Sequence, residues 1–204
     1  LTQDVAPVPF LWVLPLALYL LSFILCFDAP RYYVRPLFLA ALPFAFYGLD
    51  RIMDEGMAVP AMIALISTSL FVFCMVCHGE LVRRKPHPRH LTLFYLMLSI
   101  GGALGGMFVG LFAPAVFTAY FELPVGLFLC ALLVVVVLWQ ELRWLWRILL
   151  LLALCGYGVR LGQVSLEYVD GYRLVVRNFY SQLRISERQD GELGLKRNMV
   201  LGRI

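Results

Sequence analysis

The chain has 204 residues, of which 62% are hydrophobic and only 15% are charged. A soluble globular protein is about half apolar and about a quarter charged, so this composition excludes an ordinary water-soluble domain and indicates a polytopic membrane protein. The net charge of +4 does not predict nucleic-acid binding, because the basic residues lie mostly in short segments between apolar runs. We therefore expect a lipid bilayer as the main environment and no nucleic-acid partner.

Apolar runs along the chain are candidates for membrane-spanning helices, each of which needs about 20 apolar residues. In chain order these runs are Val8–Phe27, Tyr32–Leu49, Ala58–Cys77, Leu91–Phe112, Leu123–Leu138 and Trp144–Tyr157. The first, third and fourth are full length, and the others are shorter. The predicted fold is an all-α polytopic membrane helical bundle of about six transmembrane helices in residues 1–158.

The distribution of Arg and Lys predicts the orientation of these helices. Basic residues follow the first, third and fifth runs, and few lie on the opposite side. They are Arg31, Arg35, Arg83, Arg84, Lys85, Arg89, Arg143 and Arg147. Because basic loops stay on the cytoplasmic side, residues 78–90 are expected to be a cytoplasmic loop of a bacterial inner (cytoplasmic) membrane. The same count places the C-terminal tail on the outer side.

The segment Cys74-Met75-Val76-Cys77-His78 matches C-x-x-C-H, the pattern of c-type haem attachment. Two features disfavour haem at Cys74, Cys77 and His78. The motif ends an apolar helix, and the basic loop after it predicts the cytoplasmic side, whereas haem attachment normally takes place outside. The favoured interpretation is a pair of buried cysteines at a helix end.

Potential metal ligands gather around the same loop. They are Cys77, His78, Glu80, His87 and His90. Imidazole and carboxylate groups suit a hard or borderline cation, but Pro86 and Pro88 break any helix there, and two well-spaced ligand pairs are missing. The alternative is that His78 and Glu80 bond the loop backbone, while His87 and His90 lie at the level of the lipid head groups.

Glycines spaced four apart occur in the fourth apolar run. They are Gly101, Gly102, Gly105, Gly106 and Gly110. Small residues at this spacing let helix backbones approach closely inside a bilayer, so we predict a helix-packing face. A bent helix lining a substrate path is the alternative. The segment is not a phosphate-binding loop, because no strand precedes it.

From Leu161 onward the pattern changes from helical to period two. Val164, Leu166 and Tyr168 alternate with polar residues, and Asp-Gly pairs at 170 and 190 are typical of hairpin turns. We predict a short β-meander in residues 159–204, the start of an extramembrane β-rich region. It is too small to bury a core alone, so we expect a missing C-terminal domain or other protein subunits to cover it. Both chain ends are expected to be cut from a longer protein.

Several stretches resemble the membrane part of fused transporter (MFS-like)/spermidine synthase-like proteins. They are residues 2–20, Cys77–Leu81, Pro88–Leu96, Gly101–Gly106, Arg177–Tyr180 and Leu183–Ile185. The resemblance implies that the complete protein continues into a Rossmann-like domain for an S-adenosylmethionine-type cofactor, and that residues 159–204 open the synthase-like part. Because that domain's motifs lie beyond residue 204, no catalytic or cofactor-binding residue is assigned here.

The leading hypothesis is a membrane anchoring and assembly module without catalytic residues. It would carry a synthase-like domain or act as an accessory subunit of a larger membrane complex. Aminopropyl transfer by the complete protein is one alternative. Electron transfer through haem or metal at residues 74–90 is another, and substrate translocation is a third.

Overall fold

A computed structural model describes most of the helical part and three strands near the C-terminus. The described residues are 9–52, 58–117, 121–167, 174–177, 182–190 and 194–201. For the strands only the backbone is described. By its internal contacts the chain divides into two units, Leu1–Leu96 and Met97–Arg203.

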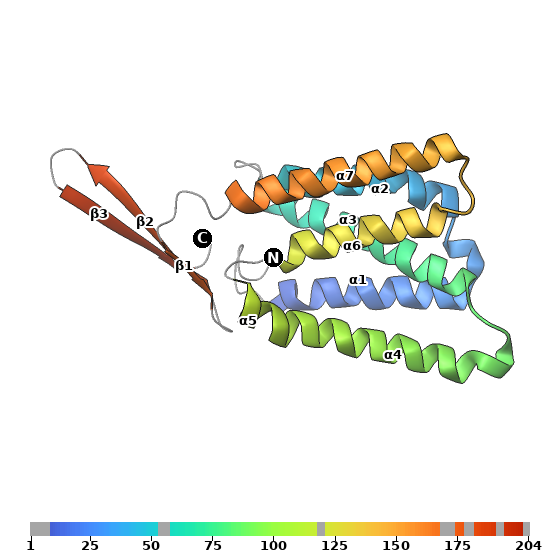
Figure 1. The fold of residues 1–204 in the computed structure, drawn as a ribbon. Coiled ribbons are helices and arrows are strands. Elements are labelled where there is room, and N and C mark those ends of the chain that lie inside the picture. The colour runs from blue at the N-terminus through green and yellow to red at the C-terminus, as the bar shows by residue number, and fades with distance from the viewer. Residues whose placement is uncertain are drawn as a thin grey trace. The chain divides into compact units, whose positions relative to one another are not determined.

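The first unit is built around three long helices (Figure 1). These are α1 (Pro9–Asp28), α2 (Arg35–Ile52) and α3 (Val59–Arg83). The helix α3 packs against both α1 and α2, so it is the central helix of this unit. Short 3₁₀ turns, η1 (Pro30–Tyr32) and η2 (Pro88–His90), each begin with a proline. Proline favours a first helical position because its φ is fixed and it lacks an N–H that a helix start would leave unpaired.

The core of the first unit lies where α3 meets its two neighbours. Met75 and Val76 of α3 are almost fully buried, as are Cys26 of α1 and Leu42 of α2. The sulfur atoms of Cys26 and Met75 are 3.8 Å apart. Apolar contacts of this kind fix the relative position of the helices near the ends of α1 and α3, where the candidate site lies.

The helix α4 (Leu91–Met107) begins in the first unit and continues into the second. It runs into a π-helical turn, η3 (Phe108–Phe112), and the short α5 (Ala113–Val116). Pro114 has no N–H to donate to the carbonyl four residues earlier, and a π-helical turn just before it changes the hydrogen-bond partners. The long helices α6 (Glu122–Leu138) and α7 (Trp144–Glu167) then pack against each other.

The strands follow α7. They are β1 (Leu174–Arg177), β2 (Gln182–Asp190) and β3 (Gly194–Leu201). They pair antiparallel in the order β1-β2-β3, with Val176 opposite Leu183 and Ile185 opposite Met199. The first Asp-Gly pair, Gly191 and Tyr168 lie outside the described residues.

The expectation of a β-region from Leu161 onward is wrong at its start, because α7 continues to Glu167. Leu154, Leu161 and Val164 are all buried. Their spacing of seven and three residues places them on one face of a helix. Leu166, which the period-two pattern pairs with Val164, is 74% exposed. The alternation in the sequence was too short to distinguish a strand from the end of an amphipathic helix.

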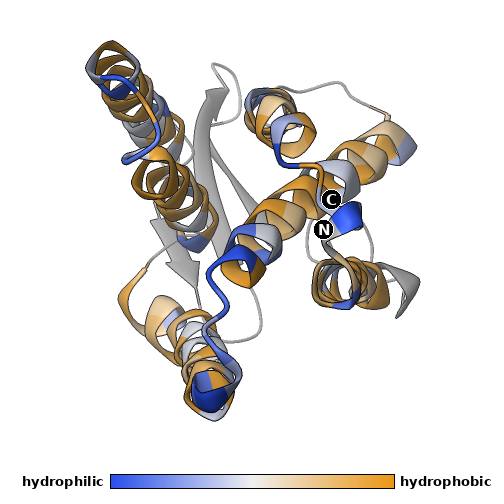
Figure 2. Ribbon diagram, turned by 90° about the vertical axis from the view of Figure 1, so that its right-hand side faces the viewer, coloured by the Kyte–Doolittle hydropathy of each residue, from blue (hydrophilic) through white to orange (hydrophobic). Residues whose placement is uncertain are grey.

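Among the described residues, three helical stretches are long and apolar enough to cross a membrane. They are Val59–Arg83, Pro88–Val116 and Trp144–Leu166. Apolar helices at Val13–Asp28 and Glu122–Leu138 are shorter. Figure 2 shows helices that are hydrophobic along most of their length, with hydrophilic residues mainly near their ends. Large apolar side chains lie on the outside, such as Phe44 at 76% exposed and Trp144 at 68%. The predicted helical fold is therefore confirmed, and three of the expected spans are long and apolar enough to cross a membrane.

The third predicted span ends too early. We expected a helix to Cys77 and a loop over residues 78–90, whereas α3 continues to Arg83. The helix closes at Arg84, where the Arg84 N–H donates to the carbonyl oxygen of Leu81 and the Lys85 N–H donates to that of Val82. His78 and Glu80 are therefore helical residues, and their side chains face neighbouring elements.

Candidate functional site

The candidate site begins at Gly79, where the Tyr33 ring lies against the backbone of α3. A Cβ atom at position 79 would overlap the Cγ, Cδ1 and Cδ2 atoms of Tyr33. Only glycine leaves room for this close approach. Tyr33 lies between η1 and α2 and is 9% exposed, so the segment that connects α1 to α2 is held against α3.

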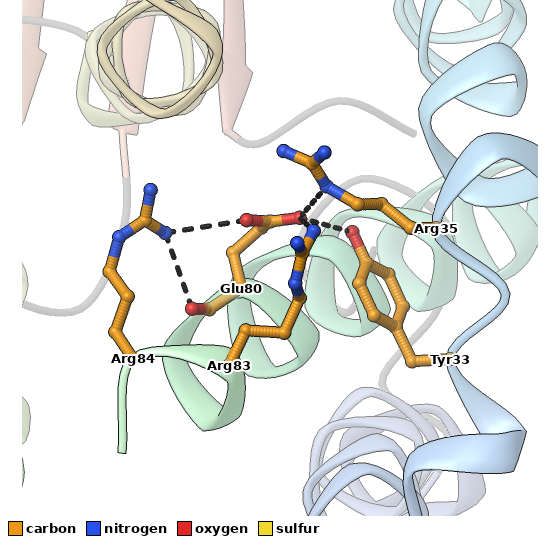
Figure 3. Close-up of polar contacts among 5 residues, drawn as sticks. All are labelled: Tyr33, Arg35, Glu80, Arg83 and Arg84. Carbon is orange, nitrogen blue, oxygen red and sulfur yellow. Dashed lines mark hydrogen bonds and ion pairs between the residues drawn. The ribbon is translucent and has the colours of Figure 1, made fainter. Parts of the chain in front are cut away.

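Glu80 is the centre of the site (Figure 3). Its side chain is only 5% exposed, and its Oε1 atom accepts hydrogen bonds from Arg35 Nε at 2.6 Å and from the Tyr33 hydroxyl at 3.1 Å. Arg83 Nη1 is 3.5 Å from the same oxygen. Arg84 Nη1 is 3.3 Å from Oε2 and also 3.3 Å from the main-chain oxygen of Glu80. A buried carboxylate requires such partners, because desolvation of an unpaired charge is costly.

The cluster brings several basic groups to one acid. Three guanidinium groups, those of Arg35, Arg83 and Arg84, contact the carboxylate of Glu80. The Arg35 side chain is 20% exposed, whereas those of Arg83 and Arg84 are about half exposed at 47% and 53%. The cluster is thus a buried acid with a basic, solvent-accessible outer side. Basic groups in the last turn of α3 also interact favourably with its helix dipole.

The surroundings of Tyr33 change the pKa of its phenol group. Burial raises its pKa above the usual value, and the charge of Glu80 and the hydrogen bond to it raise the pKa further. Arg35 and Arg83 act in the opposite direction. The phenol therefore remains a hydrogen-bond donor to Glu80 at neutral pH.

A second polar contact joins α1 to α3. Ser22 Oγ is 3.0 Å from His78 Nδ1 and donates its proton to the Tyr19 carbonyl oxygen at 2.8 Å. A hydroxyl has a single proton, so Nδ1 of His78 must carry the hydrogen and donate it to Ser22. Ser22 is fully buried and His78 is 6% exposed. The His78 ring lies edge-on to Tyr19 and Phe23, with ring centroids 5.0 and 5.4 Å apart.

The predicted metal ligands separate into different surroundings. Glu80 contacts the arginines and Tyr33, His78 contacts Ser22, and His87 and His90 are exposed around η2. In the described part of the chain, no three His, Cys, Asp or Glu side chains gather in a way that could hold a metal ion. The alternative expectation, that His78 and Glu80 bond loop backbone, is wrong, because both side chains contact side chains of other elements.

The cysteines of the haem-like pattern lie on α3. Cys74 and Cys77 are half-buried. His78 Nδ1, on the same helix, faces Ser22 of α1. The geometry thus gives His78 a packing role between helices, and haem at these residues stays a disfavoured prediction.

The glycines of α4 and η3 are open. A Cβ atom added to Gly101, Gly102, Gly105, Gly106 or Gly110 would meet no atom within 4 Å. Packing through this face therefore stays a prediction about another helix. Besides Gly79, two glycines outside this set make close contacts: Gly48 with Leu65 and Gly158 with Phe128.

Sequence reasoning identified Glu80 but missed its partners. Tyr33 lies 47 positions before Glu80, and nothing in the local pattern pairs them. Arg35 was interpreted only as an orientation signal, and Ser22 as part of an apolar run. One signal was present: the predicted topology placed Glu80 on the same side of the membrane as the basic residues of two loops, and Arg35, Arg83 and Arg84 are among them.

No protein-family model matches the chain, and neither a curated protein nor a solved structure matches it. The resemblance to fused transporter/spermidine synthase-like proteins therefore stays a prediction from sequence stretches. Among those stretches, Cys77–Leu81 contains the Gly79-Glu80 pair around which the site is built.

Proposed function

We propose that this chain is an integral membrane module that anchors and assembles a larger protein or complex, and that it contributes no catalytic residues. The observation that carries this proposal is the use of Glu80. Its carboxylate holds Tyr33 and Arg35, at the start of α2, against the end of α3. An acid whose oxygens are occupied by hydrogen bonds between helices is suited to fixing a bundle.

The Ser22–His78 contact supports the same role. A polar pair buried between α1 and α3 specifies how two apolar helices align, because unsatisfied polar groups in any other alignment would be costly. Polar residues of this kind hold helices together in bilayers, where apolar surface gives no preference of its own.

The finer parts of the proposal rest on the sequence. The membrane is a bacterial inner membrane, with the basic residues after α3 on the cytoplasmic side. The region after α7 is the β-rich opening of an extramembrane, synthase-like domain, or the docking segment of an accessory subunit. In this proposal, the exposed apolar side chains of the helices face lipid or partner helices.

The decisive experiment is native mass spectrometry of the chain, extracted from its native membrane in a mild detergent. We expect a stable assembly several times heavier than the 23.2 kDa chain. A chain that runs only as a detergent-bound monomer contradicts the assembly role. A haem absorption band or a stoichiometric metal in the purified protein contradicts the assembly role and supports electron transfer instead.

The open glycines of α4 supply a matched pair of variants for this experiment. Gly102→Leu places a large side chain on the predicted packing face, and Gly126→Leu does the same on α6, where the glycine is also open. We expect Gly102→Leu to dissociate the assembly and Gly126→Leu to leave it intact, because close helix approach needs small residues. Equal behaviour of the two variants contradicts a role for the α4 face.

A further inference from the structure

The turn between α6 and α7 is both basic and aromatic. It contains Trp139 and Arg143, and the first turn of α7 adds Trp144, Trp146 and Arg147. We call these five residues the α6–α7 cluster, and all of them lie in the second unit. The three tryptophans and Arg143 are exposed. The proposed anchoring role does not use this cluster.

Arg147 lies against the indole ring of Trp139. Its guanidinium carbon is 5.4 Å from the ring centroid, which is within the range of a cation–π contact. The Arg147 side chain is half-buried, and its Nε atom is buried without a hydrogen-bond partner. A charged group that has lost water and gained no acceptor is costly. The ring of Trp139 thus positions a guanidinium group whose hydrogen-bonding capacity is not fully used.

The two arginines lie close together at an unfavourable end of α7. The Arg147 N–H donates to the Arg143 carbonyl oxygen at 3.2 Å, so the residues are one helical turn apart. Like charges at this spacing destabilise a helix, and the positive end of the helix dipole adds to the repulsion. The first turn of α7 contains no acidic residue. A bound anion would relieve this repulsion.

The carboxylates of the protein do not supply that anion. In the described part of the chain, no carboxylate forms an ion pair with Arg143 or Arg147. Glu141, the acid of the same turn, is engaged in another interaction. The two arginines are therefore suited to an anion that comes from outside the chain.

The position of the cluster indicates which anion this is. The apolar helix α6 ends at Leu138, and the membrane-spanning stretch of α7 begins at Trp144. In the proposed membrane orientation, on which this step rests, the cluster lies where the cytoplasmic leaflet presents its phosphate groups. Exposed tryptophans are typical of this level, and basic residues there attract anionic lipids.

We propose that the α6–α7 cluster binds the phosphate group of an anionic phospholipid. Arg143 and Arg147 donate to the phosphate oxygens, because the planar, forked donors of arginine match this group. Trp139 is a positioning residue, since its ring holds the guanidinium group of Arg147. An anionic lipid is favoured over a zwitterionic one, whose own ammonium group would meet the same two positive charges.

The test uses the full chain in detergent micelles that contain either phosphatidylglycerol or phosphatidylcholine, with bound lipid counted by native mass spectrometry. We expect phosphatidylglycerol to bind preferentially. Arg143→Gln and Arg147→Gln should each weaken its binding about fivefold, the change expected for one basic residue near a lipid surface. Arg143→Gln should not lower thermal stability in lipid-free detergent, because it removes a like-charge contact. Equal binding of the two lipids by the wild type overturns the proposal.

Two further variants separate the cluster from general surface charge and from a loss of fold. Arg89→Gln removes an exposed charge of η2, on the same predicted side of the membrane, and should leave lipid binding unchanged. Trp139→Leu should lower the ratio of phosphatidylglycerol to phosphatidylcholine without lowering the amount of phosphatidylcholine bound. Equal losses for Arg89→Gln and Arg143→Gln overturn the proposal, as does an unchanged ratio in Trp139→Leu.

Inorganic phosphate distinguishes a lipid from a free anion with the same chemistry. Added to the micelles, it should not displace phosphatidylglycerol, because the lipid is also held by the bilayer-level tryptophans; displacement contradicts the lipid as ligand. The lipid count is independent of the assembly role. A monomer that prefers phosphatidylglycerol fails that role and supports this site, whereas a large assembly without lipid preference does the reverse.

Discussion

Gly79 lies directly against the ring of Tyr33, and this contact places the Tyr33 hydroxyl 3.1 Å from Oε1 of Glu80. The absence of a side chain at one position of α3 therefore determines the hydrogen bond made by the next. Through Tyr33 and Arg35, the same contact joins the α1–α2 connection to the central helix.

Replacement of Gly79 by alanine should destabilise the protein. The new Cβ would overlap the Tyr33 ring, and overpacking of this kind costs about 1–3 kcal/mol. Thermal unfolding in detergent measures the change. The control is Gly102→Ala, whose Cβ meets no atom within 4 Å. That substitution should leave stability unchanged or raise it by about 0.5–1 kcal/mol, since alanine favours helix. The same loss in both variants would contradict close packing at Gly79.

Glu80→Gln should also lower the free energy of unfolding. It removes the negative charge that three arginines contact, and loss of one partner of a buried ion pair costs about 3–5 kcal/mol. We expect the free energy of unfolding to fall by about 3 kcal/mol, at the lower end of this range, because Arg83 and Arg84 are half exposed and water screens them. Asp28→Asn removes an exposed acid at the end of α1 and should have little effect in the same denaturation experiment. Similar losses for both would show that Glu80 is no more than a surface acid.

The raised pKa of Tyr33 predicts that the free energy of unfolding falls at alkaline pH. Its pKa is raised in the folded protein by burial and by Glu80, whereas the pKa of an unfolded tyrosine is about 10. Its contribution to stability is therefore complete below pH about 10 and is lost as the pH rises from there through the higher folded pKa. The stability difference between the wild type and Tyr33→Phe should shrink over this range.

Unfolding free energies of wild type and Tyr33→Phe, measured across alkaline pH, check this prediction, together with the phenolate absorbance of each. The neighbouring Tyr32 is 38% exposed, so Tyr32→Phe is the matched control. A pH-independent difference for Tyr33→Phe would mean that the phenol is not coupled to Glu80.

The Ser22–His78 contact should show coupling in a double-mutant cycle. Ser22→Ala leaves the buried Nδ1–H of His78 without its acceptor, and an unsatisfied buried donor costs about 1–3 kcal/mol. In a His78→Phe background the serine substitution should cost less, and the difference measures the interaction. Nitrogen NMR shifts of the His78 ring provide an independent check, because the proton should be on Nδ1. Additive losses, or a proton on Nε2, would contradict this hydrogen bond.

The amino-acid sequence determined the class of this protein through composition alone. Too many residues are apolar to be hidden in a core, which predicts helices that face lipid, and the apolar runs predicted each long helix. Prolines at positions 30 and 88 begin the 3₁₀ turns, since proline tolerates that position better than a helix interior. These are local effects, and a local pattern can report them.

Only the tertiary structure decided what the polar residues do. Glu80 and His78 were predicted metal ligands, but α3 continues past Cys77 and turns Glu80 toward Tyr33 and Arg35 and His78 toward Ser22. These three partners, Tyr33, Arg35 and Ser22, lie 45 to 56 positions away in sequence. Likewise, Leu161 and Val164 are helical because they are buried together on one face of α7. Helix packing, which no short pattern records, brings these groups together and assigns their roles.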